Sequence, residues 1–158
     1  MTTPIRIAPI PAEFLERVRR DGIDDLGQPV KRVIAEGGEP CRDVLRRAHP
    51  GEELILASFS PFTKAGPYKE FGPIFVLANA ADATVRRDRL PTEGEQRFLR
   101  DQFAIRAYSD AEEIVDAAIV PATEAADAIE RFLASDRTAF LHARFPAYGC
   151  FALRIDRA

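Results

Sequence analysis

The sequence has little of what would assign it to a class of protein at once. It contains two cysteines, Cys41 and Cys150, which are too few and too far apart in the chain for a disulfide framework. No apolar run approaches the roughly 20 residues that cross a bilayer, and the first residues lack the apolar core of a signal peptide. We therefore expect a cytoplasmic protein with no membrane partner.

An excess of one charge and the common cofactor motifs are also lacking. The 22 Lys and Arg residues against 25 Asp and Glu give a net charge of −3, so no basic footprint indicates nucleic acid as a partner. No phosphate-binding loop, dinucleotide-binding glycine motif or serine-nucleophile motif is present. The sequence therefore implies no cofactor. Arginine outnumbers lysine 19 to 3, which is typical of a GC-rich bacterial genome.

What the sequence does contain is enough apolar residues for a core. The 158 residues are 46% hydrophobic and include 11 Phe, which predicts one domain, residues 1–158, that folds without metal or disulfide support. Strand and helix patterns alternate irregularly, so we expect an α+β fold with a largely antiparallel sheet, short flanking helices and a C-terminal β-hairpin. The expected helices are 11–20, 40–48, 92–100 and 124–134, and the expected strands are 4–10, 31–35, 54–59, 74–78, 104–108, 113–120, 138–145 and 148–155.

The segment 40–48 has apolar residues at helical spacing. If Pro40 opens this helix, Cys41 takes its second position, where free backbone N–H groups and the helix dipole favour a thiolate. Cys41 also belongs to the apolar face of the same helix, where a buried thiol acts as a small hydrophobe. A reactive and a structural Cys41 both stay open.

The expected C-terminal hairpin gathers polar side chains on one face if its turn has an odd length. A two-residue turn at 146–147 mixes polar and apolar side chains, whereas a three-residue turn at 146–148 sets the apolar side chains on one face. This face is either an ordinary solvent-exposed surface, with its cysteine tucked under a helix, or part of a site. The polar residues that would share it are His142, Arg144, Cys150 and Arg154.

A long connection, residues 60–73, joins two strands that are apolar on both faces. It contains three prolines, and loops of this length in compact domains are often functional. The alternative is a packed loop that Phe62, Tyr68 and Phe71 pin to the core.

Three segments stand out by their combination of glycine, proline, aromatic and charged residues. They are Gly66-Pro67-Tyr68-Lys69-Glu70-Phe71-Gly72-Pro73-Ile74-Phe75-Val76, Pro40-Cys41-Arg42 followed by Leu45, and Tyr148-Gly149-Cys150-Phe151. Together they resemble the bacterial family catalogued as domain of unknown function 1203, and the resemblance covers nearly the whole chain. The resemblance implies a bacterial protein, but it brings no reaction or substrate with it.

Arginine is the residue type that suggests a function. Guanidinium groups bind carboxylate or phosphate in a bidentate manner, and several arginines lie in or beside the three segments. We therefore expect a domain that binds a small anionic ligand near the 60–73 loop and the C-terminal hairpin. The alternative is that these arginines pair internally with acidic residues such as Glu70 or Asp156. The expected ligand-binding residues are Arg42, Tyr68, Glu70, Arg144, Tyr148 and Arg154.

Two other functions stay open. A thiol-dependent enzyme would use Cys41 or Cys150 as its nucleophile and His142 as its base. A structural or interaction protein would use the aromatic loop as a contact surface. We expect no metal site, because the four ligand-type residues, Cys41, His49, His142 and Cys150, contain no closely spaced pair. Ligand identity, substrate and oligomeric state are not determined by the sequence.

Overall fold

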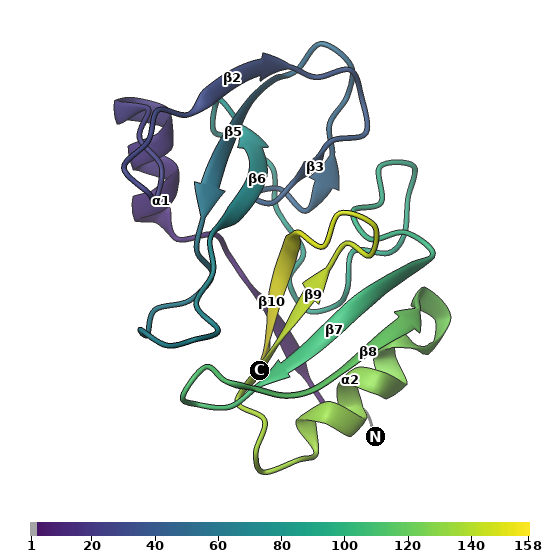
Figure 1. The fold of residues 1–158 in the computed structure, drawn as a ribbon. Coiled ribbons are helices and arrows are strands. Elements are labelled where there is room, and N and C mark those ends of the chain that lie inside the picture. The colour runs from purple at the N-terminus through teal and green to yellow at the C-terminus, as the bar shows by residue number, and fades with distance from the viewer. Residues whose placement is uncertain (1–2) are drawn as a thin grey trace.

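The computed structural model describes residues 3–158 and contains two five-stranded sheets (Figure 1). Sheet I has the strand order β1-β10-β9-β7-β8 and is antiparallel throughout. Sheet II has the order β2-β5-β6-β3-β4 and is antiparallel except between β3 and β6. The expected α+β class is therefore confirmed. The strands are β1 (Ile5–Ala8), β2 (Lys31–Ile34), β3 (Pro40–Cys41), β4 (Arg46–Arg47), β5 (Glu53–Phe59), β6 (Gly72–Leu77), β7 (Gln102–Tyr108), β8 (Ile114–Pro121), β9 (Phe140–Arg144) and β10 (Phe151–Arg157).

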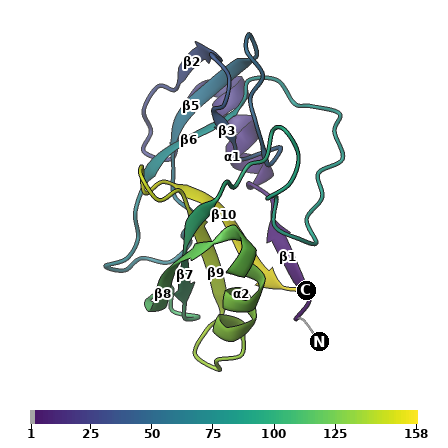
Figure 2. The same cartoon turned by 90° about the vertical axis from the view of Figure 1, so that its right-hand side faces the viewer.

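Sheet I buries one of its faces against helix α2 (Ala125–Leu133), which Figure 2 shows in front of the strands. A 3-10 turn, η2 (Ala122–Glu124), leads into this helix. The apolar side of α2, including Ile129 and Phe132, forms one core cluster with apolar side chains of β7, β9 and β10. The amphipathic pattern of the sequence is therefore what attaches this helix to the sheet.

Sheet II packs against the N-terminal helix. Helix α1 (Ala12–Glu16) continues as a π-helical turn, η1 (Arg17–Asp21), and stops at Gly22, whose φ of 67° is a left-handed conformation that glycine adopts without strain. Phe14 and Val18 of this helix belong to one core cluster with apolar residues of β5 and β6. Both flanking helices, α1 and α2, agree with the sequence pattern.

The prediction of a helix over 40–48 was wrong. These residues form β3, a tight turn and β4, so that the chain adds to the edge of sheet II. The Arg42 N–H donates to the carbonyl of Phe75 on β6 at 2.9 Å. Pairing with a strand far away in the sequence outweighs a weak local helical pattern. Cys41 therefore has no helix N-terminus beside it.

The segment 92–100 is not the expected helix either. It runs as irregular chain beside β4, where Arg97 forms an isolated bridge with Arg46. The adjacent side chains of Phe98 and Leu99 are both fully buried. Burial of these consecutive apolar residues at the sheet edge outweighs the local signals for helix initiation.

The C-terminal hairpin of β9 and β10 is present, and a bulge between Phe151 and Leu153 shifts its register by one residue. Before the bulge, Phe151 pairs with Arg144, which is the register of a turn of even length. After the bulge, Arg154 pairs with His142, which is the register of a turn of odd length. The polar face therefore includes an aromatic residue. Of the two alternatives for this face, the ordinary solvent-exposed surface does not hold, because His142 and Arg144 are 0% and 5% exposed.

The loop of residues 60–71 covers this face of sheet I. Its Phe62 is buried in an aromatic cluster with side chains of β7 and β9. The carboxylate of Glu112 accepts hydrogen bonds from the backbone N–H groups of the two residues after Phe62, at 3.0 and 2.6 Å. Tyr68 and Phe71, which the sequence also suggested as anchors, are each 42% exposed. One aromatic ring and one carboxylate thus fix the start of the loop.

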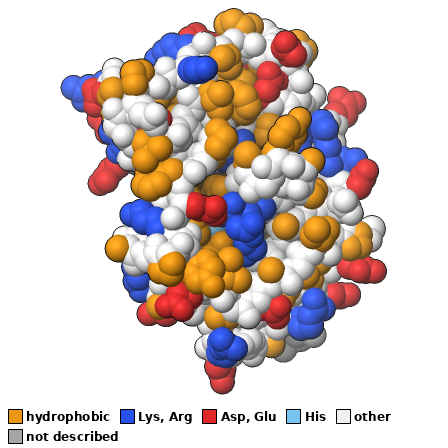
Figure 3. Space-filling view, in the orientation of Figure 1, with side chains coloured by type: hydrophobic (Ala, Val, Ile, Leu, Met, Phe, Trp, Pro, Cys, Tyr) orange, Lys and Arg blue, Asp and Glu red, His pale blue; other side chains and the backbone are white. Residues whose placement is uncertain are grey.

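Figure 3 shows the molecule from the side of Figure 1. Apolar side chains lie on both halves of this face. Between the two halves, a group of basic side chains lies next to a group of acidic side chains. Charged side chains of both signs surround the rim. Within residues 3–158, the structure has no helix that is long and apolar enough to cross a membrane.

Candidate functional site

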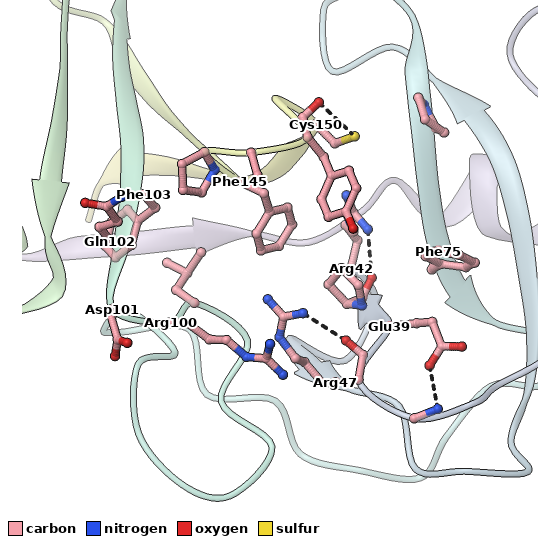
Figure 4. Close-up of a pocket in the computed structure, with 18 of the residues that line it drawn as sticks. Glu39, Arg42, Arg47, Phe75, Arg100, Asp101, Gln102, Phe103, Phe145 and Cys150 are labelled. Carbon is pink, nitrogen blue, oxygen red and sulfur yellow. Dashed lines mark hydrogen bonds between the residues drawn. The ribbon is translucent and has the colours of Figure 1, made fainter.

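A pocket of about 850 Å³ lies where the two sheets meet (Figure 4). Sheet II contributes side chains of β3, β5 and β6, and sheet I contributes the start of β7 and the β9–β10 turn. The irregular segments 36–39 and 99–101 complete the wall. A volume of this size is typical of small-molecule sites.

Arg42 is the most deeply buried charged residue of the pocket, with 3% of its surface exposed. Its position follows from the turn after β3, which directs the side chain toward the C-terminal hairpin. Its Nε donates to the Phe151 carbonyl at 2.9 Å and its Nη1 donates to the Pro40 carbonyl at 2.8 Å. Burial lowers the pKa of Arg42 to about 10. No carboxylate within residues 3–158 forms an ion pair with it, and its hydrogen bonds go to backbone carbonyls.

Arg47 reaches the same pocket from β4. Its Nη1 and Nη2 donate to the carbonyls of Gly38 and Phe98 at 2.8 and 3.1 Å, while its buried Nε has no partner. The ring of Phe145 lies between the two arginines, with its centre 5.0 Å from Cζ of Arg42 and 5.4 Å from Cζ of Arg47. One aromatic ring thus contacts two cations.

Arg100 places a third guanidinium group beside that of Arg47 (Figure 4). The pKa of Arg47 is lowered first by burial and then by the positive charges of Arg100 and Arg97. The side chain of Arg100 extends over Gly38. Its Nη2 lies 3.8 Å from the position that a Cβ atom would take at Gly38. In the part of the chain that the structure describes, neither Arg47 nor Arg100 forms an ion pair. The pocket therefore gathers three positive charges without a fixed counter-charge.

Three acidic residues, Glu36, Glu39 and Asp101, also line the pocket wall, and none of them forms an ion pair with Arg42, Arg47 or Arg100 in the described chain. The carboxylates of Glu39 and Asp101 have other partners. The Glu39 carboxylate accepts hydrogen bonds from the backbone N–H groups of Glu36 and Gly37 at 2.8 and 2.9 Å. Burial raises the pKa of Glu39, but these backbone hydrogen bonds outweigh it and hold the pKa below its usual value. Asp101 accepts from Arg97 at 2.9 Å. Neither carboxylate neutralises the three arginines.

The rest of the pocket is largely apolar. Phe75 of β6 and Phe145 face it from opposite sheets (Figure 4), and Leu99 and Phe103 extend the wall near Arg100. Tyr148 of the β9–β10 turn is 88% exposed at the rim. The site therefore combines guanidinium groups with flat apolar surfaces.

The two cysteines have different surroundings. Cys41 is 0% exposed, and burial raises its pKa to about 12. Cys41 does not line the pocket, so the structure supports the interpretation of this residue as structural. Cys150 is half-buried and lines the pocket.

A second group of arginines lies outside the pocket, on the other side of the β9–β10 turn. Glu70 of the 60–71 loop accepts a hydrogen bond from Arg144 and lies 3.6 Å from Nη1 of Arg106. Nη1 of Arg144 also donates to the Gly149 carbonyl at 3.1 Å. We call Glu70, Arg106 and Arg144 the paired cluster. In this cluster the internal pairing that the sequence left open is present.

Arg154 is also paired. It donates to Asp156 from Nε and Nη2 at 3.0 and 2.9 Å, and its Cζ lies 3.9 Å above the ring of Phe140. This arginine therefore has both a carboxylate and an aromatic partner inside the fold.

His142 lies in a box of aromatic rings. The ring centres of Phe62, Tyr108, Phe140 and Phe151 are 4.8 to 5.2 Å from its own. Both ring nitrogens are buried without a hydrogen-bond partner in the described chain. Burial, followed by the charges of Arg154 and Arg106, lowers the pKa of His142 to about 3. The imidazole is therefore neutral, and it does not line the pocket.

The structure brings three of the residues suggested by the sequence into the pocket, namely Arg42, Tyr148 and Cys150. It places the others elsewhere: Cys41 in the core, His142 in the aromatic box, Tyr68 exposed on the loop, Glu70 and Arg144 in the paired cluster, and Arg154 beside Asp156. The pocket thus lies on the far side of the hairpin turn from the 60–71 loop.

Sequence reasoning missed Arg47, Arg100 and Phe145. Arg47 lies in the 40–48 segment and Arg100 at the end of the 92–100 segment, and neither of the two expected helices forms. A usable signal was present in the run of arginines at 46–47 with no acid directly beside it. No sequence pattern connects Arg47 with Arg100, because they meet only through the bridge between β4 and the 92–100 segment.

Within residues 3–158, the structure contains no group of three or more His, Cys, Asp or Glu side chains that could hold a metal ion. The model of one protein family, described as "Protein of unknown function (DUF1203)", matches residues 38–157. This range includes all three pocket arginines and the paired cluster. No curated protein and no solved structure matches the chain.

Proposed function

This chain belongs to the DUF1203 family of proteins of unknown function, and from its own residues we propose that it binds a small organic anion in the pocket of Arg42, Arg47 and Arg100. One observation carries the proposal. Three guanidinium groups surround one pocket without an ion-pair partner among the described residues, although 25 acidic residues are present in the chain. Buried charges in proteins are normally paired, and an unpaired group in a cleft is a candidate for ligand binding.

The apolar walls define the ligand further. Phe75 and Phe145 present ring surfaces, while the three guanidinium groups offer bidentate hydrogen bonds to a carboxylate or phosphate. A ligand with an anionic head and a flat apolar body would use both features. A volume of about 850 Å³ accommodates a molecule of that kind.

The location differs from the expected one. The site near the 60–73 loop would have relied on Arg144, whose charge Glu70 already meets. We therefore place the ligand on the opposite side of the β9–β10 turn, where Arg42, Tyr148 and Cys150 remain available.

Calorimetric titration with 2-naphthoate and its neutral isostere 2-naphthamide tests this proposal. We expect the carboxylate to bind and the amide to bind at least about tenfold more weakly, since one charge-assisted hydrogen bond contributes roughly 1.5–3 kcal/mol. Arg100→Gln should weaken naphthoate binding by about tenfold without unfolding the protein, because Arg100 is exposed.

Arg137→Gln is the matched control, since Arg137 is an exposed arginine on the chain after α2 and does not line the pocket. Equal affinity for the acid and the amide would contradict the proposal. An equal loss of affinity in the Arg100 and Arg137 variants would contradict it as well, because binding would then depend only on net charge.

A role as an interaction surface is favoured by a different feature. Tyr68 and Phe71 are each 42% exposed on the 60–71 loop, away from the pocket. A contact through this loop is compatible with ligand binding, and cross-linking of the protein in a lysate, with Tyr68→Ser as the comparison, tests it.

The proposed setting is the bacterial cytoplasm. Cys41 and Cys150 are both free thiols, which agrees with a reducing compartment. Fractionation of cells that express the protein at its natural level tests the location directly.

A further inference from the structure

Cys150 is the thiol that a ligand in the pocket would meet. It is half-buried, it lines the pocket (Figure 4), and its Sγ lies 3.7 Å from the Tyr148 carbonyl. Cys41, by contrast, is fully buried and donates from Sγ to the Glu39 carbonyl at 3.6 Å. The chain therefore has one thiol that lines the pocket, Cys150, and one buried thiol, Cys41, with which its reactivity can be compared.

Two buried arginines hold the backbone on either side of Cys150. Arg144 donates to the carbonyl of Gly149 at 3.1 Å, and Arg42 donates to the carbonyl of Phe151 at 2.9 Å. These arginines are 5% and 3% exposed, respectively. The position of Cys150 between them is thus fixed from both sides of the turn.

The same two guanidinium groups are buried cations beside Cys150, since each binds a backbone carbonyl next to it. Burial lowers the pKa of both arginines. Positive charges beside a cysteine are a common feature of reactive thiols. An accessible thiol, two buried cations beside it and a pocket lined by further arginines occur together.

We propose that Cys150 undergoes thiol–disulfide exchange with small disulfides that carry carboxylate groups, and that the pocket arginines select them. This inference deepens the proposed function and rests on it, because the same arginines would bind the free anionic ligand. The disulfide brings its carboxylate to Arg47 and Arg100 while one of its sulfurs approaches Cys150.

The exchange needs no further reagent. The Cys150 thiolate attacks one sulfur of the disulfide and forms a new S–S bond to that half of the molecule. The original S–S bond breaks, and its electron pair leaves with the other half as a thiolate, which takes up a proton from water. Cys150 is oxidised, the released half is reduced, and the protein keeps a mixed disulfide.

The bound half then occupies the pocket. A mixed disulfide at Cys150 places its carboxylate among the guanidinium groups that the free ligand needs. Oxidised low-molecular-weight thiols would therefore switch ligand binding off, and a reductant would restore it. Conversely, a bound ligand would protect Cys150 from exchange.

Stopped-flow kinetics with two aromatic disulfides test this inference. The anionic probe is 5,5′-dithiobis(2-nitrobenzoate) and the neutral probe is 4,4′-dithiodipyridine, and peptide mass spectrometry assigns the modified cysteine. The rate with the anionic probe is divided by the rate with the neutral probe, once for the folded protein and once for the same thiol in urea. Dividing the first ratio by the second corrects for the difference in intrinsic reactivity between the two probes. We expect this normalised ratio to favour the anionic probe by about tenfold, as charged clefts accelerate the entry of counter-ions.

Variants test whether the pocket arginines cause the preference for the anionic disulfide, or whether Cys150 reacts only because it is exposed. Arg100→Gln should reduce the preference several-fold, Arg137→Gln should leave it unchanged, and Cys150→Ser should abolish the fast phase while Cys41 stays unmodified. A normalised ratio near one in the native protein overturns the inference. A preference that survives unchanged in the Arg100 variant also overturns it, because the pocket would then not be the cause.

Naphthoate binding to the Cys150→Ser protein separates this inference from the proposed function. If the variant binds naphthoate and the native thiol shows no anionic preference, exchange at Cys150 fails and anion binding stands. If the variant and the native protein both fail to bind naphthoate, the proposed function fails whatever the thiol does.

Discussion

The pocket and the paired cluster contain the same residue type in two electrostatic states. In the paired cluster, Glu70 meets the charges of Arg106 and Arg144, and the arginines hold the 60–71 loop on sheet I. In the pocket, Arg42 and Arg47 have carbonyl and aromatic partners, and neither they nor Arg100 form an ion pair with a carboxylate among residues 3–158. The two groups lie on opposite sides of one turn.

The difference shows that burial of arginine alone does not identify a ligand site. Arg144 and Arg42 are about equally buried, at 5% and 3% exposure, and both donate to the backbone beside Cys150. One acidic side chain separates a structural arginine from one that has a free charge. Moving or removing that acidic charge should therefore interchange the properties of the two groups.

The largest effect should follow from giving the pocket a carboxylate of its own. Arg100→Glu removes one guanidinium group and places an acid beside Arg47, where it can form the ion pair that Glu70 forms in the paired cluster. We expect naphthoate affinity to fall by about a hundredfold, since a repelling charge in a site costs several kcal/mol. Calorimetric titration measures the loss.

Arg137→Glu changes the net charge by the same amount away from the pocket and serves as the control. Native affinity in the Arg100→Glu protein would show that Arg100 does not contact the ligand.

The next effect concerns His142, which pairs across the sheet with Arg106 of the paired cluster. Its pKa is about 3 in the folded protein against an ordinary 6.5. Between these values the unfolded chain binds more protons than the folded one, so the free energy of unfolding falls as pH drops below 6.5. The slope should reach about 1 kcal/mol per pH unit.

Urea unfolding at several pH values, with the native protein and His142→Phe, measures this slope. Phe fits among the surrounding rings and does not titrate, so the variant should lose less stability in acid than the native protein. His49→Phe at an exposed position is the control. Equal slopes for the native and His142→Phe proteins would exclude His142 as the cause.

The smallest effect should come from Glu70→Gln. The substitution leaves Arg144 without its carboxylate, but Glu70 is 43% exposed, so solvent screens the lost charge. We expect a loss of about 1 kcal/mol in the free energy of unfolding. Sulfate should restore part of it, because the cluster then resembles the pocket in having unpaired guanidinium groups.

Urea unfolding with and without sulfate at constant ionic strength tests this expectation. Glu16→Gln removes one partner of an exposed pair with Arg20 and should change neither the stability nor the response to sulfate. A Glu70 variant that behaves like the Glu16 variant would mean that the ion pair does not hold the loop.

Most of the strands could be predicted because their signal is local. Segments 54–59 and 104–108 show continuous or alternating apolar residues, and they correspond to β5 and β7. The stripe on α2 was equally clear. Segments 40–48 and 92–100 could not be predicted, because their hydrogen-bond partners lie on strands remote in the sequence.

The candidate site was predicted in part. Arg42 and Cys150 were singled out from their own segments, and both line the pocket. Arg47 and Arg100 were not, since their proximity depends on the unexpected strand β4 and on irregular chain beside it. His142 was expected on a polar face that was either exposed or part of a site, whereas the rings around it, including Phe62 of the loop, bury it.

The sequence by itself determined the fold class, the two flanking helices and the C-terminal hairpin, because apolar periodicity and turn residues act over a few positions. It also determined that arginine supplies most of the positive charge, with 19 arginines against 3 lysines. Only the tertiary structure decided which arginines have a carboxylate partner and which thiol meets a pocket. These properties depend on distances between segments far apart in the chain, and electrostatic pairing at a few ångströms leaves no periodic trace in the sequence.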